Sequence, residues 1–268
     1  MNKKITTLFL TGILAVSSLS IVYAAPKKAA QGKGLVLSKG QYVIEQKQAD
    51  VNGDKIEDTV FLIGEKDKKE DIYNKNIMVK VIDGKKNQVK DIKFKDFGGY
   101  EGELFLGDFT GDKVSDIMVT TSTGGSGGIV NTRIATIKDN KVKEIFKEED
   151  NQGLNFTGEF VDGFKAELKD LKNNEEIILD VSAFKDMYVE GKIYDKDGKL
   201  LEKVEPWTDP FSKVDAVDMD GDGVYELKGY QKISGSCHAD TISRINTIWK
   251  YENEKWNIKE ADYSTFLK

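Results

Sequence analysis

The stretch Asp218-Met219-Asp220-Gly221-Asp222-Gly223-Val224-Tyr225-Glu226 decides how the rest of the chain is interpreted. Its four carboxylates stand at alternate or near-alternate positions around two glycines, which let the backbone fold back without a clash at Cβ. Calcium takes about six to eight oxygen ligands, mostly carboxylates and carbonyls. The stretch therefore predicts a loop that binds a hard cation through side chains at positions 1, 3, 5 and 9 and one backbone carbonyl at position 7.

The same pattern occurs twice more, at residues 50–58 and 108–116, in the common form D-x-[N/T/D]-G-D-x-[I/V]-x-[D/E]. One such run has a simple explanation, because clusters of Asp, Asn and Gly are also ordinary turn residues. Three copies with the same constraints favour up to three Ca²⁺ sites. The predicted ligands are Asp50, Asn52, Asp54, Ile56, Asp58, Asp108, Thr110, Asp112, Val114, Asp116, Asp218, Asp220, Asp222, Val224 and Glu226.

The three loops differ from the helix-loop-helix type of calcium site, which needs a glycine at position 6 and a bidentate Glu at position 12. Their twelfth residues are Phe61, Val119 and Gly229, and their constant glycine is the fourth residue. Apolar, β-branched residues follow, as in residues 59–63 and 117–121, which is typical of strands. The loops are therefore expected to connect strands.

Side-chain charge predicts a ranking of the three sites. The loop at 218 offers four carboxylates, whereas Asn52 and Thr110 each replace one of them in the other loops. We expect the 218 loop to bind Ca²⁺ most tightly and the 108 loop most weakly.

The N-terminus is typical of a signal peptide at residues 1–24. Lys3 and Lys4 precede an apolar run from Ile5 to Tyr23, and small residues suitable for cleavage end at Ala24. The alternative is an uncleaved anchor. Residues 25–34 resemble a flexible linker, which leaves residues 35–268 as the folded domain. We expect an extracellular protein that is released or held at the cell envelope, without membrane insertion after cleavage.

Composition narrows the classes of partner. Removing residues 1–24 leaves 38 basic and 46 acidic side chains, a formal charge of −8, which disfavours nucleic acid and anionic membranes as partners. The single cysteine, Cys237, excludes intramolecular disulfides as a source of stability. Bound cations could stabilise an exported fold in place of disulfides. The oligomeric state stays open.

Tight turns between alternating segments recur about every 56 residues, at Asp83-Gly84, Asp139-Asn140, Asp197-Gly198 and Glu252-Asn253. The repeated unit is strand, acidic loop, strand, Gly/Ser loop, strand, turn, strand. Residues 158–167 keep Asp162-Gly163 but lack the ligands, so we interpret them as a repeat without a cation, with strands at 176–181 and 191–194. The alternative is a domain boundary there. The pattern predicts an all-β, β-propeller-like domain of about four repeats of four antiparallel strands.

The D-x-[N/D]-G-D-x-x-[D/E] loops, each followed by a strand, resemble the FG-GAP or VCBS repeats of the calcium-binding β-propeller in integrin α chains. The resemblance covers most of residues 35–268 and implies propeller blades with structural Ca²⁺. The Phe-Gly and Gly-Ala-Pro sequences of that family are mostly absent, and Phe97-Gly98-Gly99 is the nearest match. Four units are fewer than the family's usual seven, so both a four-bladed ring and an open arc remain possible.

Catalytic candidates are few. Ser236-Cys237-His238 contains the only histidine, and adjacent residues of an extended loop point to opposite sides, which favours a surface loop. Paired carboxylates could cleave glycosidic bonds, but their spacing in space is not visible in a sequence. The aromatic residues Trp207, Trp249, Tyr251 and Trp256 are expected in the strand core, with a sugar-binding platform as the alternative.

We therefore expect a secreted calcium-binding module without catalysis, whose partner is a cell-surface protein or a glycan. An exported polysaccharide hydrolase or lyase with structural calcium is the alternative. A stability module that binds another protein of the cell surface or spore layer is a third reading.

Overall fold

Short strands dominate the computed structural model, which describes residues 34–172 and 175–266 within a unit spanning Gly32–Lys268. The predicted signal peptide and residues 25–33 of the predicted linker lie outside the described residues. The strands are β1 (Gln41–Ala49), β2 (Asp58–Glu65), β3 (Asn76–Ile82), β4 (Val89–Lys93), β5 (Tyr100–Gly107), β6 (Asp116–Ser122), β7 (Val130–Thr136), β8 (Lys143–Phe146), β9 (Phe156–Val161), β10 (Lys165–Asp170), β11 (Glu176–Asp180), β12 (Trp207–Thr208), β13 (Lys213–Val217), β14 (Glu226–Ser234), β15 (Thr241–Glu252) and β16 (Lys255–Ser264). The helical segments are the 3₁₀ turns η1 (Lys138–Asn140), η2 (Glu149–Gln152) and η3 (Ser182–Phe184), and the short helix α1 (Lys185–Glu190).

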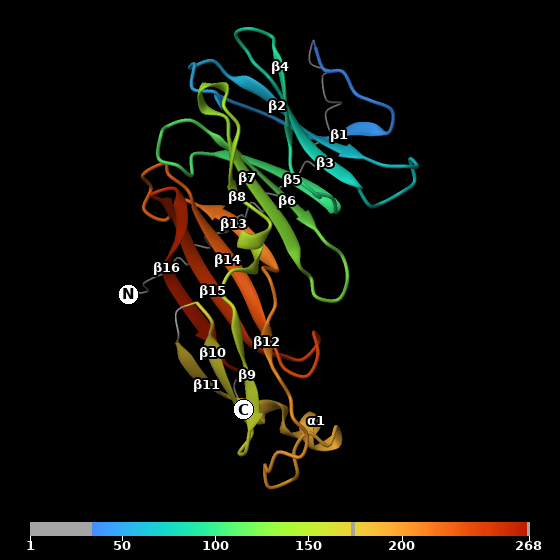
Figure 1. Cartoon of the computed structure of the whole chain (residues 1–268), viewed down its shortest axis with the longest axis vertical. Helices are drawn as coiled ribbons and strands as arrows, with labels where there is room; N and C mark the ends of the chain where they lie inside the picture. The colour runs from blue at the N-terminus through green and yellow to red at the C-terminus, as the bar shows by residue number, and fades with distance from the viewer. Residues whose placement is uncertain (1–33, 173–174, 267–268) are drawn as a thin grey trace, which may run out of the picture. The chain divides into compact units, whose positions relative to one another are not determined.

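Three antiparallel units of four strands are built in chain order. They are β1-β2-β3-β4, β5-β6-β7-β8 and β13-β14-β15-β16 (Figure 1). In each unit an acidic loop joins the first strand to the second, and one of the predicted tight turns joins the third to the fourth. The all-β, antiparallel class and this order of strands and loops agree with the sequence.

The remaining strands extend the last unit instead of standing apart from it. β9, β10 and β11 form an antiparallel meander whose first turn is Asp162-Gly163, at the place predicted for a repeat without ligands. The two-residue strand β12 pairs with β9 on one side and with β14 on the other, because Trp207 lies opposite both Thr157 and Ser234. These contacts join β9–β16 into one eight-stranded sheet.

The strand predicted at 191–194 is wrong. Residues 185–190 form α1 instead, and Gly191 ends it, its N–H bonded to the carbonyl of Met187. Tyr194 then packs against Phe160 and Phe164 in a buried aromatic cluster and makes only an isolated bridge to Leu200. Burying this ring outweighs the alternating pattern that suggested a strand.

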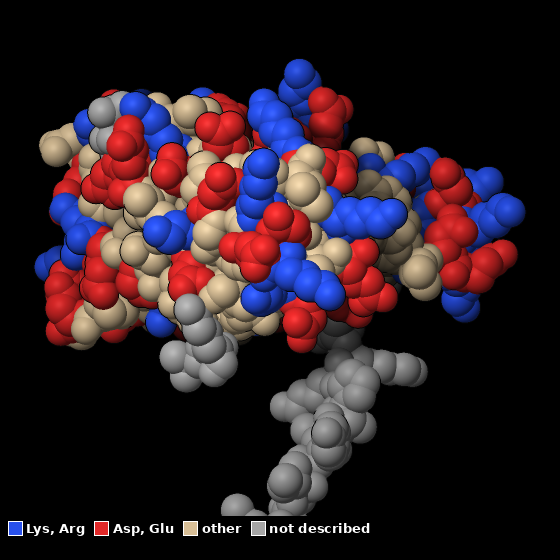
Figure 2. Space-filling view, turned by 90° about the horizontal axis from the view of Figure 1, so that it is seen from below, with Lys and Arg blue, Asp and Glu red and all other residues tan. Residues whose placement is uncertain are grey.

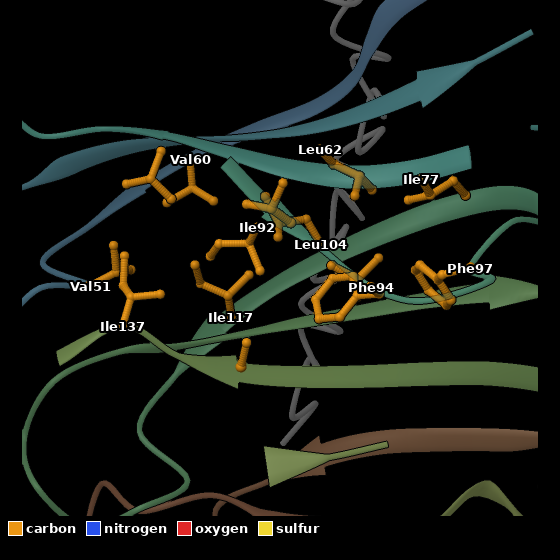
Figure 3. Packing of buried hydrophobic residues seen from close by; sticks show 14 residues of the cluster. Val51, Val60, Leu62, Ile77, Ile92, Phe94, Phe97, Leu104, Ile117 and Ile137 are labelled. Carbon is orange, nitrogen blue, oxygen red and sulfur yellow. The ribbon is translucent and has the colours of Figure 1, made fainter. Parts of the chain in front are cut away.

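The first two sheets pack face to face (Figures 1 and 3). Figure 3 shows Val60 and Leu62 of β2 and Ile92 of β4 facing Leu104 of β5 and Ile117 of β6, all of them buried. On β6, Ile117 and Val119 enter this core, whereas Met118 points to the opposite face and packs with Phe211, which precedes β13, and with Leu227 of β14. A strand buried on both faces needs a continuous apolar run, which explains the sequence Ile117-Met118-Val119.

The outward face of the first sheet is covered by the chain that precedes β1. Phe61 and Ile63 of β2 point away from the main core and pack with Leu35 and Leu37. On the face seen in Figure 2, basic and acidic side chains are interspersed. Among the described residues, no helix has the length and apolar character needed to cross a membrane.

Candidate functional site

The three acidic segments, called loop 50–58, loop 108–116 and loop 218–226, occupy equivalent places. They connect β1 to β2, β5 to β6 and β13 to β14, and the acid at position 9 is the first residue of the second strand in each. All fifteen predicted ligand residues therefore lie in, or at the edge of, these three connections. Their position between strands agrees with the sequence-based expectation.

The first Asp of each loop organises the turn through its side chain. Asp50 accepts hydrogen bonds from the N–H groups of Gly53 (2.7 Å) and Lys55 (2.8 Å). Asp108 accepts the matching bonds from Gly111 (2.7 Å) and Lys113 (2.7 Å). Asp218 does the same with the amides of residues 221 (2.8 Å) and 223 (3.1 Å). Positions 1 and 4 of the motif thus have a structural role even without a ligand.

The glycine at position 4 is required by the backbone. Its φ is +84° at Gly53, +75° at Gly111 and +75° at Gly221, a conformation that side chains with a Cβ rarely adopt. Position 6 is also left-handed, at φ +69° for Lys55 and +66° for Lys113. The Asp at position 5 then closes the turn by accepting from the N–H at position 7, at 3.0, 3.0 and 2.7 Å in the three loops.

The acid at position 9 is buried in every loop, with exposed fractions of 0 % for Asp58, 0 % for Asp116 and 4 % for Glu226. Each accepts from the N–H at position 2, at 3.1, 2.9 and 3.2 Å respectively. Burial raises the pKa of Asp58, and it raises the pKa of Asp116 to about 7. These acids tie the start of the loop to the second strand.

Successive loops contact one another in a repeated way. The N–H of Ser115 donates to the carbonyl of Asp50 at 3.0 Å, and the N–H of Tyr225 donates to the carbonyl of Asp108 at 2.7 Å. Both bonds run from position 8 of one loop to position 1 of the preceding loop. The three loops therefore form one stack, which we call the loop ladder.

The loops differ in how their carboxylates converge. Oxygen atoms of Asp218, Asp220 and Asp222 all lie within 4.8 Å of one another and are exposed, and no other group of three possible ligands this close is found in residues 34–172 and 175–266. An all-oxygen set of this kind suits a hard cation such as Ca²⁺. In the other loops, Asp54 Oδ2 and Asp116 Oδ1 are buried without a hydrogen bond of normal geometry, although the Thr136 side chain acts on the Asp116 carboxylate and lowers its pKa.

Two lysines from neighbouring strands reach the acidic loops. Lys250 Nζ of β15 lies 2.7 Å from Glu226 Oε1 and 3.8 Å from Asp222 Oδ2. Lys138 Nζ, just after β7, lies 3.0 Å from Asp112 Oδ2. Sequence reasoning missed both residues because they follow their loops at a distance, and no local motif marks a lysine as facing an acidic turn.

The segment Ser236–His238 has an ordered environment but no serine–histidine pair. The Ser236 hydroxyl donates to Asp240 at 2.9 Å, and His238 Nδ1 lies 2.9 Å from Oδ1 of the buried Asp209. Trp207 Nε1 donates to the same Asp209 oxygen at 3.0 Å. Cys237 is exposed and free. The arrangement agrees with the expected surface loop, held down by two buried carboxylates.

An open groove of about 880 Å³ lies over the exposed face of β9, β10 and β11, with Trp207 at its border. Glu159 and Glu167 stand directly opposite each other across β9 and β10. Neither carboxylate has a hydrogen bond or an ion pair within 4.0 Å among the described residues, although Lys203 of the same groove interacts electrostatically with Glu159. Like charges in directly opposed positions destabilise a sheet. Because its hydrogen bond to Asp209 fixes the indole, the groove has one rigid aromatic border.

The comparisons with known proteins identify related sequences but no function. Residues 154–264 match the family model of the YybI C-terminal domain, a range that begins just before β9 and ends with β16. The chain is 32% identical to the uncharacterized protein YybI of Bacillus subtilis (strain 168) over 251 residues, covering 90% of this chain and 95% of the relative. No solved structure gives a significant match.

Proposed function

The chain belongs to the YybI family, and from that premise we propose that it is a secreted, calcium-binding repeat protein that acts as a binding module of the cell envelope without catalysis. The observation that carries the proposal is the convergence of Asp218, Asp220 and Asp222 oxygens within 4.8 Å in a loop type that recurs at the same connection in three units.

The chain's own residues define how the ion would be held. Asp218, Asp220 and Asp222 supply side-chain oxygens, with the carbonyl of Val224 and the carboxylate of Glu226 at the border of the loop. Bound Ca²⁺ would supply positive charge that compensates the mutual repulsion of these acids. Loops 50–58 and 108–116 carry the same positions, so Asp54 Oδ2 and Asp116 Oδ1 would gain an electropositive partner. Each filled site stabilises the folded chain by about 2.7 kcal/mol at a hundredfold excess over Kd.

A calcium titration tests this proposal. Isothermal calorimetry and thermal unfolding of the purified protein, after treatment with EDTA, should show binding and a higher Tm with Ca²⁺. Mg²⁺ serves as the control ion, because it needs a smaller and more regular octahedral site. An unchanged Tm together with no heat of binding would exclude the calcium function.

We further propose that the three four-stranded units are propeller-type blades of FG-GAP or VCBS character, arranged as an open arc. Their first strands, β1, β5 and β13, share one cavity of about 630 Å³, which contains Lys47, Glu103 and Val214. First strands gathered around a common space are expected of blades around an axis. An experimental structure with calcium would test the number of blades and the closure of the ring.

The partner that the groove favours is a glycan of the cell surface. Trp207 offers a fixed aromatic surface, and Glu159 and Glu167 offer free acceptors for hydroxyl groups. A glycan array with the Glu159→Gln/Glu167→Gln variant tests this, and the ion-paired Glu254, which does not line the groove, changed to Gln, provides the control. Glycan turnover that either Glu159 or Glu167 substitution abolishes would instead establish the polysaccharide hydrolase.

Secretion rests on the sequence of residues 1–24 and is tested separately. N-terminal sequencing of the protein recovered from culture medium or from the cell envelope should begin at Ala25. A chain that retains Met1 in the membrane fraction would establish the uncleaved anchor.

A further inference from the structure

We propose that Lys250 is a resident counter-cation of loop 218–226, which Ca²⁺ has to displace, so that this lysine sets the affinity of the site. The inference rests on the proposed calcium function and adds a residue outside the motif that controls it.

The position of Lys250 is that of a bound cation. Its ammonium lies 2.7 Å from Glu226 Oε1 and 3.8 Å from Asp222 Oδ2, and its side chain is 22% exposed. Glu226, with a side chain 5% exposed, is enclosed beside it. The other charged groups of the loop that face this space, Asp218 and Asp220, are acidic. The ammonium is thus the positive charge that the described chain itself supplies to this cluster.

A metal ion and the ammonium compete for the same oxygens. Ca²⁺ binds carboxylate oxygen at about 2.3–2.6 Å, so an ion shared by Asp222 and Glu226 would lie only a few ångströms from Nζ. Two cations at that separation repel each other strongly in a partly enclosed site. The long, flexible lysine stem lets Nζ swing into solvent, which makes displacement feasible.

The other two loops differ from loop 218–226 in how many of their acids pair with a lysine. In loop 108–116, Lys138 pairs with one acid only, Asp112, at 3.0 Å. In loop 50–58, no Lys or Arg of the described residues lies within 4.0 Å of an Asp50, Asp54 or Asp58 carboxylate oxygen, and Asp54 Oδ2 is buried without a partner. Occupancy by lysine, in addition to the number of carboxylates, therefore distinguishes the three loops.

The test measures Ca²⁺ binding by calorimetry and the Tm of the metal-free full-length protein. Lys250→Met is expected to raise the affinity of one site by about tenfold or more and to lower the metal-free Tm, because Glu226 loses its partner. Lys250→Arg keeps the charge and should stay within about twofold of wild type. Lys259→Met is the matched control. It removes a lysine of the neighbouring strand β16 that pairs with Glu252, at the end of β15.

Adding Asp220→Asn to Lys250→Met assigns the site, because the gain in affinity should disappear in that double variant. Lys250→Gln replaces Lys250→Met if the methionine variant does not fold. Unchanged or weaker Ca²⁺ binding by the charge-removing variant overturns the inference while leaving the calcium function intact. No Ca²⁺ binding by wild type or by any variant overturns the proposed function itself.

Discussion

Loops 108–116 and 218–226 share one backbone design but have different surroundings. In both, the first Asp accepts from positions 4 and 6, and the ninth residue accepts from position 2. The ninth residue is buried in both loops, but in loop 218–226 this residue, Glu226, pairs with Lys250, and three Asp side chains converge beside it in an exposed cluster. The comparison shows that one backbone turn can place its carboxylates in different surroundings.

The largest difference between the two loops is expected in the pH dependence of metal-free stability. Burial raises the pKa of Asp116 from 3.8 to about 7, so the folded chain holds a proton that the unfolded chain has released between these values. Stability therefore falls as pH rises from about 4 to about 7, by up to about 4 kcal/mol. Urea unfolding in EDTA at several pH values measures this, and Asp116→Asn should reduce the slope, while Asp58, Glu144 and Asp150, whose pKa values burial also raises, keep a smaller part of it.

The control for this prediction is Asp220→Asn, which removes an exposed carboxylate of the other loop and should keep the wild-type profile. An equal slope in wild type and Asp116→Asn would show that Asp116 does not titrate in this range.

A smaller effect, about 2.7 kcal/mol at a hundredfold excess of Ca²⁺ over Kd, is expected from filling loop 218–226. Asp220→Asn should remove this gain and change metal-free stability by less than about 0.5 kcal/mol, because Asp220 is exposed. Asp222 is a poorer choice, since it accepts from the Val224 N–H at 2.7 Å, whereas Asp220 accepts from the Asp222 N–H at 3.3 Å and Asn keeps an acceptor oxygen there. Thermal unfolding with and without Ca²⁺ measures both quantities, and a loss that is the same in EDTA would make Asp220 a structural residue.

Because the two loops share one backbone conformation, we expect substitutions of the glycine at position 4 to have equal effects on stability. Gly111→Ala and Gly221→Ala should each cost about 1 kcal/mol, because both glycines have φ +75° and an added Cβ would meet nothing closer than 3.8 Å. Denaturant unfolding of the two variants tests the equality. A cost confined to one of them would mean that the two turns differ in solution.

The smallest effect is expected at position 6. Lys113 is held at φ +66°, whereas the corresponding Gly223 adopts φ +84° without strain. Lys113→Gly should therefore stabilise loop 108–116 by about 0.5 kcal/mol, after the greater freedom of glycine in the unfolded chain is subtracted. Lys141→Gly, outside any acidic loop, is the comparison, and a similar gain there would point to a general charge effect.

The sequence was sufficient for the features set by local chemistry. The constant glycines and acids placed the three connections, and the apolar runs beginning at Thr59 and Ile117 placed β2 and β6. The sequence could not show that Asp116 is enclosed or that Lys250 faces Glu226, because both depend on strands packed from elsewhere in the chain. It also could not show β12, since two residues have no detectable period.

The loop ladder determines how a further unit could be added to such a protein. Each unit carries its own docking contact, an amide at position 8 and a carbonyl at position 1, so duplicating a unit also duplicates the means of attaching it. The segment β9–β11 has a short turn where the other units have an acidic loop. Loop 218–226 stacks directly on loop 108–116, although this segment separates the two loops in the chain. A segment without an acidic turn thus has no place in the loop ladder, and β9–β11 joins the sheet through the edge pairing of Trp207 instead.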